Sequence, residues 1–320
     1  MTMNRLPRIR DLQAGSAGYG FFLCAKKETR SGKNGEYLAL VLQDVSGEVG
    51  AKVFQDVDAL KQEFDAGEFV KVQGRGNSFN QRLELIVDKI RRVMPDKDAV
   101  DGFREEECIQ CAPRPIGDMW AELTGRVDAI TDPHIRALVD RLLVQHEERL
   151  RIWPAAKEVH HAYRGGLLEH ILKISEIALY LADAYGAKRD VVFAGVLLHD
   201  IGKLRELTYD ITTGYSVEGN LVGHIVIGVG LLRDAVRDLP GFPPDMLLEL
   251  EHLILSHHGA REMGSPVLPM TMEAFILAAS DDLDAKIHQV RRAFAEDDSD
   301  GAFTSYHKRL GRVLYKPSGS

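Results

Sequence analysis

The sequence predicts a two-domain protein, with a small β-barrel at the N-terminus and a larger all-α domain at the C-terminus. The 320 residues, 45% of them hydrophobic, suffice for two globular cores. Short β-rich runs separated by turn signals fill residues 18–93, whereas apolar residues at helical spacing dominate after residue 118. We therefore expect a barrel domain over residues 1–94, a charged, Pro-containing linker over residues 95–117 and an all-α domain over residues 118–320.

Five strand-like runs follow one another in the N-terminal domain. They lie in residues 18–28, 36–44, 47–54, 68–76 and 82–90. An amphipathic helix is predicted over residues 55–64, between the third and fourth runs. Five strands with one helix at this point is the order of an OB-fold barrel.

Such a barrel binds single strands by stacking bases on aromatic rings while Lys and Arg follow the backbone. The candidate stacking residues are Phe21, Phe22, Tyr37 and Phe79. The candidate backbone contacts are Lys26, Lys33, Arg75 and Arg82. Alternate aromatic residues in a small barrel also commonly fill its core, and the pattern alone does not separate the two arrangements.

The C-terminal domain contains clear helix signals. Asp132 and Pro133 are typical of a helix start, and an apolar stripe over residues 165–185 stops at Gly186. Apolar side chains on a further stretch, residues 225–232, could support a homo-oligomer. The second domain is therefore predicted to be entirely helical.

Composition limits the location and the partners of the protein. The formal net charge is −8; residues 1–95 carry 15 Lys and Arg against 12 Asp and Glu, and the remaining residues carry 25 against 36. Any nucleic-acid contact must therefore be local. No apolar run of membrane-spanning length and no signal-peptide pattern occur, so we expect a cytoplasmic protein without a membrane partner. Three cysteines, two of them in "CIQC", predict neither a disulfide framework nor a four-cysteine zinc site.

The run "GVLLHDIGKL", residues 195–204, places charged groups in an almost wholly apolar segment, which is costly without compensation. The polar groups in this and other apolar helical runs are His170, His199, Asp200, Lys203, His224, His257, His258 and Asp281. Imidazoles and carboxylates suit divalent transition metals, and this set exceeds what one ion accepts. We predict two ions bridged by Asp200, which would activate water for in-line attack on a phosphoryl group. Lys203, one turn further on, would neutralise phosphate charge.

His170, the "HD" at 199 and 200, and Asp281 resemble the HD superfamily of metal-dependent phosphohydrolases. The segments "HHAYRGGLLEH", "LLHDIGK", "GHIVIG", "LSHHG" and "FTSYHKRLGRVLYK", behind an OB domain, resemble the YhaM family of 3′-5′ exoribonucleases. That resemblance implies Mn²⁺, with Co²⁺, Fe²⁺, Mg²⁺ or Zn²⁺ as alternatives. It also implies a single-stranded RNA or DNA end as substrate and release of nucleoside monophosphates.

The resemblance assigns the metal ligands residue by residue. They are His170, His199, Asp200, His224, His257, His258 and Asp281. Asp282 and Asp284 compete with Asp281, which is favoured because "DDLDA", residues 281–285, matches the terminal "DxxDA" motif of the superfamily. Asp284 would then support a ligand or form a helix salt bridge.

Four residues ahead of the first histidine ligand have two alternative roles. They are His160, His161, Tyr163 and Arg164, which could hold substrate phosphate or support the metal ligands from behind. Two alternative functions also stay open. One is a phosphohydrolase acting on a small nucleotide or a cyclic dinucleotide, with a regulatory OB domain. The other is a nucleic-acid-binding protein with an inactive metal site.

Overall fold

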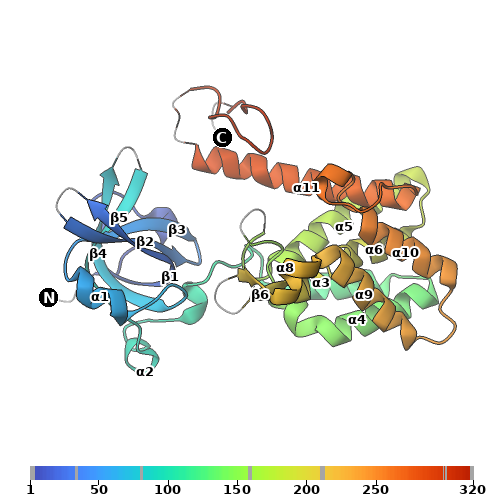
Figure 1. Cartoon of the computed structure of the whole chain (residues 1–320), viewed down its shortest axis with the longest axis horizontal. Helices are drawn as coiled ribbons and strands as arrows, with labels where there is room; N and C mark the ends of the chain where they lie inside the picture. Colours follow the sequence, from blue (N-terminus) through green and yellow to red (C-terminus); the bar gives the residue numbers. More distant parts are fainter. Residues whose placement is uncertain are drawn as a thin grey trace. The chain divides into compact units, whose positions relative to one another are not determined.

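The computed structural model describes residues 4–32, 35–79, 82–157, 161–209, 213–297, 299 and 301–317, and the side chains of Phe79, Arg82 and Glu296 fall outside this description. The chain divides into two compact units, a barrel unit up to Cys111 and a helical unit from Ala112 (Figure 1). Among the described residues, no helix combines the length and the apolar character needed to cross a membrane.

The barrel unit is built from five strands and one longer helix. Its elements are β1 (Ala17–Gly32), β2 (Gly35–Asp44), β3 (Gly47–Val53), α1 (Val57–Glu63), β4 (Phe69–Phe79) and β5 (Arg82–Arg92), with a 3₁₀ turn over Ile9–Asp11. The strands close in the order β1-β2-β3-β5-β4, and β3 and β5 form the one parallel pair recorded among them. This topology, with α1 between the third and fourth strands, confirms the OB-fold prediction.

Alternate side chains of these strands fill the barrel. Leu38, Leu40 and Leu42 of β2 face inward and are 3% exposed or less, in keeping with the two-residue period of a strand. Phe22 of β1 belongs to the same core. The interior is thus occupied by side chains and leaves the outer face of the sheet for contacts.

Residues 95–111 pack on the outside of the barrel, where a linker over 95–117 was expected. They contain α2 (Pro95–Asp98) and a 3₁₀ turn over Glu105–Glu107. The Phe103 ring contacts Phe21 and Phe69 edge-on, with centroids 5.4 and 5.6 Å apart. Asp98, 1% exposed, accepts two hydrogen bonds of 2.7 Å from Arg91. Polar sequence suggested a linker because the few apolar residues that anchor this segment are widely spaced.

The helical unit is a bundle with one small hairpin of strands. Its elements are α3 (Ile116–Asp128), α4 (Pro133–Ile152), α5 (Gly166–Tyr185), α6 (Arg189–Leu198), α7 (Lys203–Glu206), β6 (Leu207–Tyr209), β7 (Thr213–Tyr215), α8 (Val217–Val222), α9 (His224–Arg237), α10 (Pro244–Ser256) and α11 (Met272–Glu296), with a 3₁₀ turn over Arg261–Met263. The sequence predicts an entirely helical domain, and among the described residues the structure adds the antiparallel strand pair β6-β7 to the helices.

The predicted helix ends are present. The side chain of Asp132 accepts hydrogen bonds from two backbone N–H groups of the first turn of α4, as an N-cap does. Gly186 has φ +71° directly after α5, a left-handed conformation that favours glycine at this position.

Helices α5 and α6 carry the centre of the core. Every side chain of α6 from Val191 to Leu198 is buried, and α5 presents Leu167, Ile171 and Ile174 to the same cluster. Most of the large apolar side chains in residues 225–232 are buried in this core as well. That stretch therefore exposes little apolar surface through which two copies of the chain could associate. The homo-oligomer remains a prediction.

Candidate functional site

His199 and Asp200 lie in the turn between α6 and α7, at the bottom of a cluster of histidines. The close approach of this turn to α9 requires a glycine, because a Cβ at Gly202 would lie 1.9 Å from the carbonyl oxygen of His224. Asp200 is 2% exposed and His199 is fully buried. The apolar helix α6 thus delivers two polar side chains into the interior.

One group of side chains faces the Oδ2 atom of Asp200. The Nε2 atom of His170, from α5, lies 3.6 Å from this oxygen, and Nε2 of His199 lies 3.3 Å from it. Asp281, from α11, places Oδ1 3.3 Å from His170 Nε2. Potential ligand atoms of His170, His199 and Asp281 all lie within 4.8 Å of one another.

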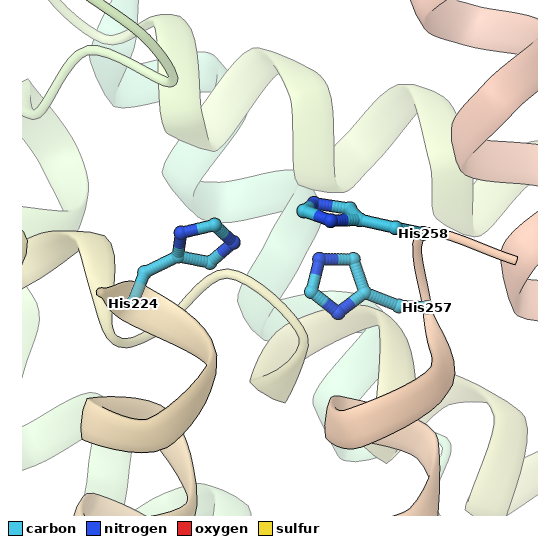
Figure 2. Close-up of side chains that lie close together, drawn as sticks. All are labelled: His224, His257 and His258. Carbon is cyan, nitrogen blue, oxygen red and sulfur yellow. The ribbon is translucent and has the colours of Figure 1, made fainter. Parts of the chain in front are cut away.

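A second group faces the other carboxylate oxygen of Asp200. His224 at the start of α9 and His257 at the end of α10 place Nε2 3.6 and 3.9 Å from Oδ1. His258 completes the group, and Figure 2 shows the three rings turned toward one another. Their ligand atoms again lie within 4.8 Å of each other. Asp200 therefore stands between two triads.

The second nitrogen of four of these rings is held by a neighbouring oxygen. Two of the oxygens are carboxylate oxygens: Nδ1 of His170 lies 2.9 Å from Asp284 Oδ2, and Nδ1 of His224 lies 3.0 Å from Glu206 Oε1. The other two are backbone carbonyl oxygens: Nδ1 of His199 lies 2.8 Å from that of Val196, and Nδ1 of His257 lies 2.7 Å from that of Ile254. Because each oxygen accepts the Nδ1 proton, Nε2 of each ring in its neutral form carries a lone pair toward the cluster, and His170 takes this form when the proton between its Nε2 and Asp281 Oδ1 is displaced. The sequence singled out neither Glu206 nor the two carbonyls, since their roles depend on where the chain folds back.

The polar atoms at the centre fit a pair of divalent cations. In the described part of the chain, Nε2 of His199, His224 and His257, Nδ1 of His258 and Oδ1 of Asp200 are buried without a hydrogen-bond partner. Buried polar atoms of this kind are expensive unless something else satisfies them. Imidazole nitrogen with carboxylate oxygen is a donor set for divalent transition metals, and two triads sharing one carboxylate suit two ions.

The electrostatics of the cluster favour the forms that ligands need. Burial opposes ionisation of Asp200, yet Lys203 and His199 hold the pKa of its carboxyl well below the usual range. Burial and the neighbouring His199 keep the pKa of His257 well below its usual value, so this ring is neutral. Burial would also lower the pKa of His170, but hydrogen bonds to two carboxylates raise it to about 9. A bound cation would replace that proton.

The three aspartates near the end of the site occupy different positions. Asp281 is the one within the first triad, as favoured from the sequence. Asp282 is exposed and lies 2.6 Å from Lys286 on its own helix. Asp284 is buried and contacts the outer nitrogen of His170, so it lies behind this ring. Lys203 places Nζ 2.6 Å from Asp200 Oδ2, beside the cluster.

Two of the four residues ahead of His170, His161 and Tyr163, are corrected as candidate phosphate contacts because neighbouring carboxylates engage their polar atoms. His161 is buried, with Nδ1 3.0 Å from Glu169 and Nε2 3.3 Å from Asp284, and Tyr163 donates to Glu169 at 2.6 Å. Both therefore support the ligands from behind, the second of the two roles considered. A Cβ at Gly166 would lie 1.9 Å from the His161 carbonyl oxygen, which explains the glycine there. Arg164 is half-buried, and His160 lies outside the described residues.

Two of the predicted stacking residues in the barrel are also corrected. Phe22 is 3% exposed inside the barrel, and Phe21 is 5% exposed beneath residues 95–111. Neither ring can receive a base. Lys33 and the side chains of Phe79 and Arg82 lie outside the described residues.

An aromatic pair does remain on the outer face of the barrel. Tyr37 of β2 and Phe54, directly after β3, have ring centroids 5.4 Å apart, and Phe54 is 55% exposed. Phe54 was not among the residues predicted to stack, although the inward period of Val49, Ala51 and Val53 places it on the outer face. The two remaining cationic candidates, Lys26 and Arg75, are exposed, and Arg75 lies 3.3 Å from Asp88.

Comparison with known proteins agrees with both units. Residues 167–286 match the HD domain family and residues 24–93 match the OB-fold nucleic acid binding domain family. The 3′-5′ exoribonuclease YhaM of Bacillus subtilis (strain 168) is 36% identical over 302 residues, which cover 93% of this chain and 94% of that protein. That of Geobacillus sp. (strain WCH70) is 35% identical over 300 residues, or 92% of this chain and 91% of that protein. This chain belongs to the YhaM family of 3′-5′ exoribonucleases.

Proposed function

We propose that this protein hydrolyses single-stranded RNA from the 3′ end at a pair of divalent cations and releases nucleoside monophosphates. One observation carries the mechanism: each oxygen of the Asp200 carboxylate faces its own group of histidines. The direction of degradation follows from membership of the family. A strand held with its 3′ end at this cluster would present the terminal phosphodiester to both groups.

We assign one cation to His170, His199 and Asp281 and the other to His224, His257 and His258, with Asp200 shared. When bound, such ions polarise phosphate oxygens and make water nucleophilic near neutral pH. Mn²⁺ is the ion we propose, because the resemblance to the family implies it, and the carboxylates of Asp200 and Asp281 supply oxygen ligands of the kind that this ion takes beside the imidazoles. A count of two ions per chain by elemental analysis would support this assignment.

The remaining residues of the site act on charge and orientation. Lys203, whose Nζ contacts Asp200 Oδ2, balances the buried carboxylate and would meet the phosphate charge that grows during hydrolysis. Glu206 and Asp284 fix the rings of His224 and His170 through their Nδ1 atoms. These contacts thus fix the orientation of the rings and the charge around Asp200.

The barrel would hold the strand upstream of the cleaved end. Tyr37 and Phe54 offer two adjacent rings on which bases can stack, and Lys26 adds positive charge. Stacking tolerates any base, so an exonuclease can hold a strand of any sequence in this way. Preference for RNA over DNA would need a contact to the 2′-hydroxyl. A cytoplasmic location, predicted from the sequence, stays a prediction.

Labelled oligonucleotides test the proposal. The purified protein with Mn²⁺ should release the label of 3′-labelled single-stranded RNA at once as a mononucleotide and should convert 5′-labelled RNA into a ladder of shortening products. EDTA should stop both reactions. Internal cleavage, or hydrolysis of a cyclic dinucleotide without shortening of RNA under any divalent ion, would contradict the proposal.

A further inference from the structure

The last described segment, residues 301–317, forms a small hairpin at the end of the long helix α11 (Figure 1). The backbone N–H of Thr304 donates to the carbonyl of Leu314 at 2.8 Å. At the base, Nζ of Lys316 contacts the carboxylate of Asp297 at 2.7 Å. The segment is therefore a pre-formed scaffold that can present side chains in fixed positions.

The hairpin differs in charge from the rest of its unit. Residues 301–320 contain four Lys and Arg and no Asp or Glu, whereas residues 112–300 contain 19 Lys and Arg against 30 Asp and Glu. Lys308, Arg309 and Arg312 are exposed. A polyanion approaching this acidic unit would find positive charge concentrated here.

Three aromatic rings share the same segment. Phe303, Tyr306 and Tyr315 are 55%, 64% and 57% exposed. The rings of Phe303 and Tyr315 meet edge to face, with centroids 5.6 Å apart. At the tip, Gly311 has φ +65°, and a Cβ there would lie 3.8 Å from the Tyr306 hydroxyl, so this ring lies along the turn. Exposed rings gathered in one short segment indicate a contact surface.

We propose that this hairpin is a second single-stranded RNA contact, with the three rings stacking on bases and Lys308 and Arg309 contacting phosphates. The inference rests on the proposed RNA substrate. Proteins that bind single-stranded nucleic acids combine aromatic rings with Lys and Arg, because the rings stack on the bases while the cations contact the phosphates. A second copy of the chain is the alternative partner. It could cover the rings or attract the cations, but contact with another protein does not require rings and cations to alternate along one short segment.

Binding measurements without divalent ions test the proposal on the full chain. The affinity for a fluorescent single-stranded RNA of about 12 nucleotides is measured in EDTA over a range of salt. The slope of log affinity against log salt is negative, and replacing two cations, Lys308→Ala with Arg309→Ala, should make it less steep by about 1.4. Tyr306→Ala should weaken binding about fivefold or more and leave the slope unchanged.

A matched control removes two exposed arginines of the same unit outside the hairpin. Arg189→Ala with Arg237→Ala leaves every hairpin residue in place and breaks two surface ion pairs, with Asp183 and Asp234. Its salt slope should equal that of the wild type. A control that lowers the slope as much as the hairpin variant would overturn the assignment of the contact to the hairpin.

Two further results separate the hairpin from the proposed function. Unchanged binding in the hairpin variants, while the wild type still shortens RNA, overturns the hairpin contact alone. A reduced slope supports the contact even if the wild type fails to shorten RNA, which would overturn only the proposed function. Loss of a larger assembly in sedimentation, with RNA binding unchanged, would assign the hairpin to a second copy and overturn the proposal.

Discussion

The two units present different side chains where each would meet the substrate: the helical unit offers buried polar groups, and the barrel unit offers exposed aromatic rings. In the helical unit, Asp200 and His199 are almost fully buried and their polar atoms face other polar atoms. In the barrel unit, Tyr37 and Phe54 lie on the outer face, and Phe54 remains half in solvent. A buried polar cluster is costly until its ligand is bound, whereas an exposed ring loses little when nothing covers it.

This difference predicts two kinds of response to mutation. The cluster around Asp200 is one connected network, so removing one member disturbs the others. The barrel surface is a set of separate contacts, each of which adds a small increment to binding. Substitutions in the helical unit should therefore abolish the chemistry, and substitutions on the barrel surface should weaken binding in steps.

The largest effect is expected at Asp200. Asp200→Asn should lower kcat on single-stranded RNA by about a thousandfold or more, because one electrostatic group of an active site contributes about 10²–10³ and this carboxylate faces both triads. Initial rates with Mn²⁺ measure the change. Asp282→Asn, an exposed carboxylate on the neighbouring helix, is the control and should keep near wild-type activity. An equal loss of kcat in both variants would contradict a special role for Asp200.

Phe22 gives the largest expected effect on the barrel. Phe22→Ala should lower the free energy of unfolding of this unit by about 3–5 kcal/mol, because it leaves a cavity in a closed core. Hydrogen exchange of the amides of β1 and β4 would follow the loss. Phe54→Ala is the control and should leave exchange almost unchanged. A stable Phe22→Ala variant that binds RNA poorly would restore Phe22 as a stacking residue.

Asp98 tests whether residues 95–111 belong to the barrel. Asp98→Asn should destabilise the unit by about 2–3 kcal/mol, since it leaves Arg91 and Lys71 without their shared carboxylate, and both cations are partly solvated. The hydrogen bond from Arg91 is the largest of the contributions that lower the pKa of Asp98 below its usual value of 3.8. Because the folded-state pKa is the lower one, this stabilisation is complete above about pH 5 and declines as the pH falls through 3.8 and below.

Unfolding by urea at pH 7 and pH 3 would measure both effects. The difference between wild type and Asp98→Asn should shrink at pH 3, because the carboxyl of Asp98 takes up a proton in the unfolded wild type at a pH at which it is still ionised in the folded protein. A difference that stays constant with pH would mean that the interaction of Asp98 does not depend on its charge. No loss at either pH would show that the segment is only loosely attached.

The sequence predicted those site residues whose polar side chains lie in apolar helices, because burying such a side chain without a partner is costly. His170 and Asp200 occur in apolar helices, where a polar side chain needs a partner, so their convergence could be predicted from residue type and motif. The choice of Asp281 over its neighbours came from the motif and agrees with the geometry. Glu206 could not be found in this way, because it contacts His224 only through the fold of α7 against α9.

The barrel strands were predicted, but the direction of their aromatic rings was not. Phe21 and Phe22 are neighbours on one strand and point to opposite faces, and both are buried because residues 95–111 cover the outer one. A period of two separates the faces of a strand but does not say whether the outer face is covered. That information lies in Phe103 and Cys108, in a segment whose composition is typical of a linker.

The smallest expected effect concerns Phe54. Phe54→Ala should weaken binding of single-stranded RNA by about 1 kcal/mol, the lower end for one stacked base, because Tyr37 remains in place to stack on the strand. The slope of log affinity against log salt should not change, since no charge is removed. Lys26→Ala is the matched contrast, with a slope reduced by about 0.7 and a comparable loss at low salt. If neither variant altered binding while the hairpin variants did, the strand would be held by the helical unit alone, and the barrel face would need another partner.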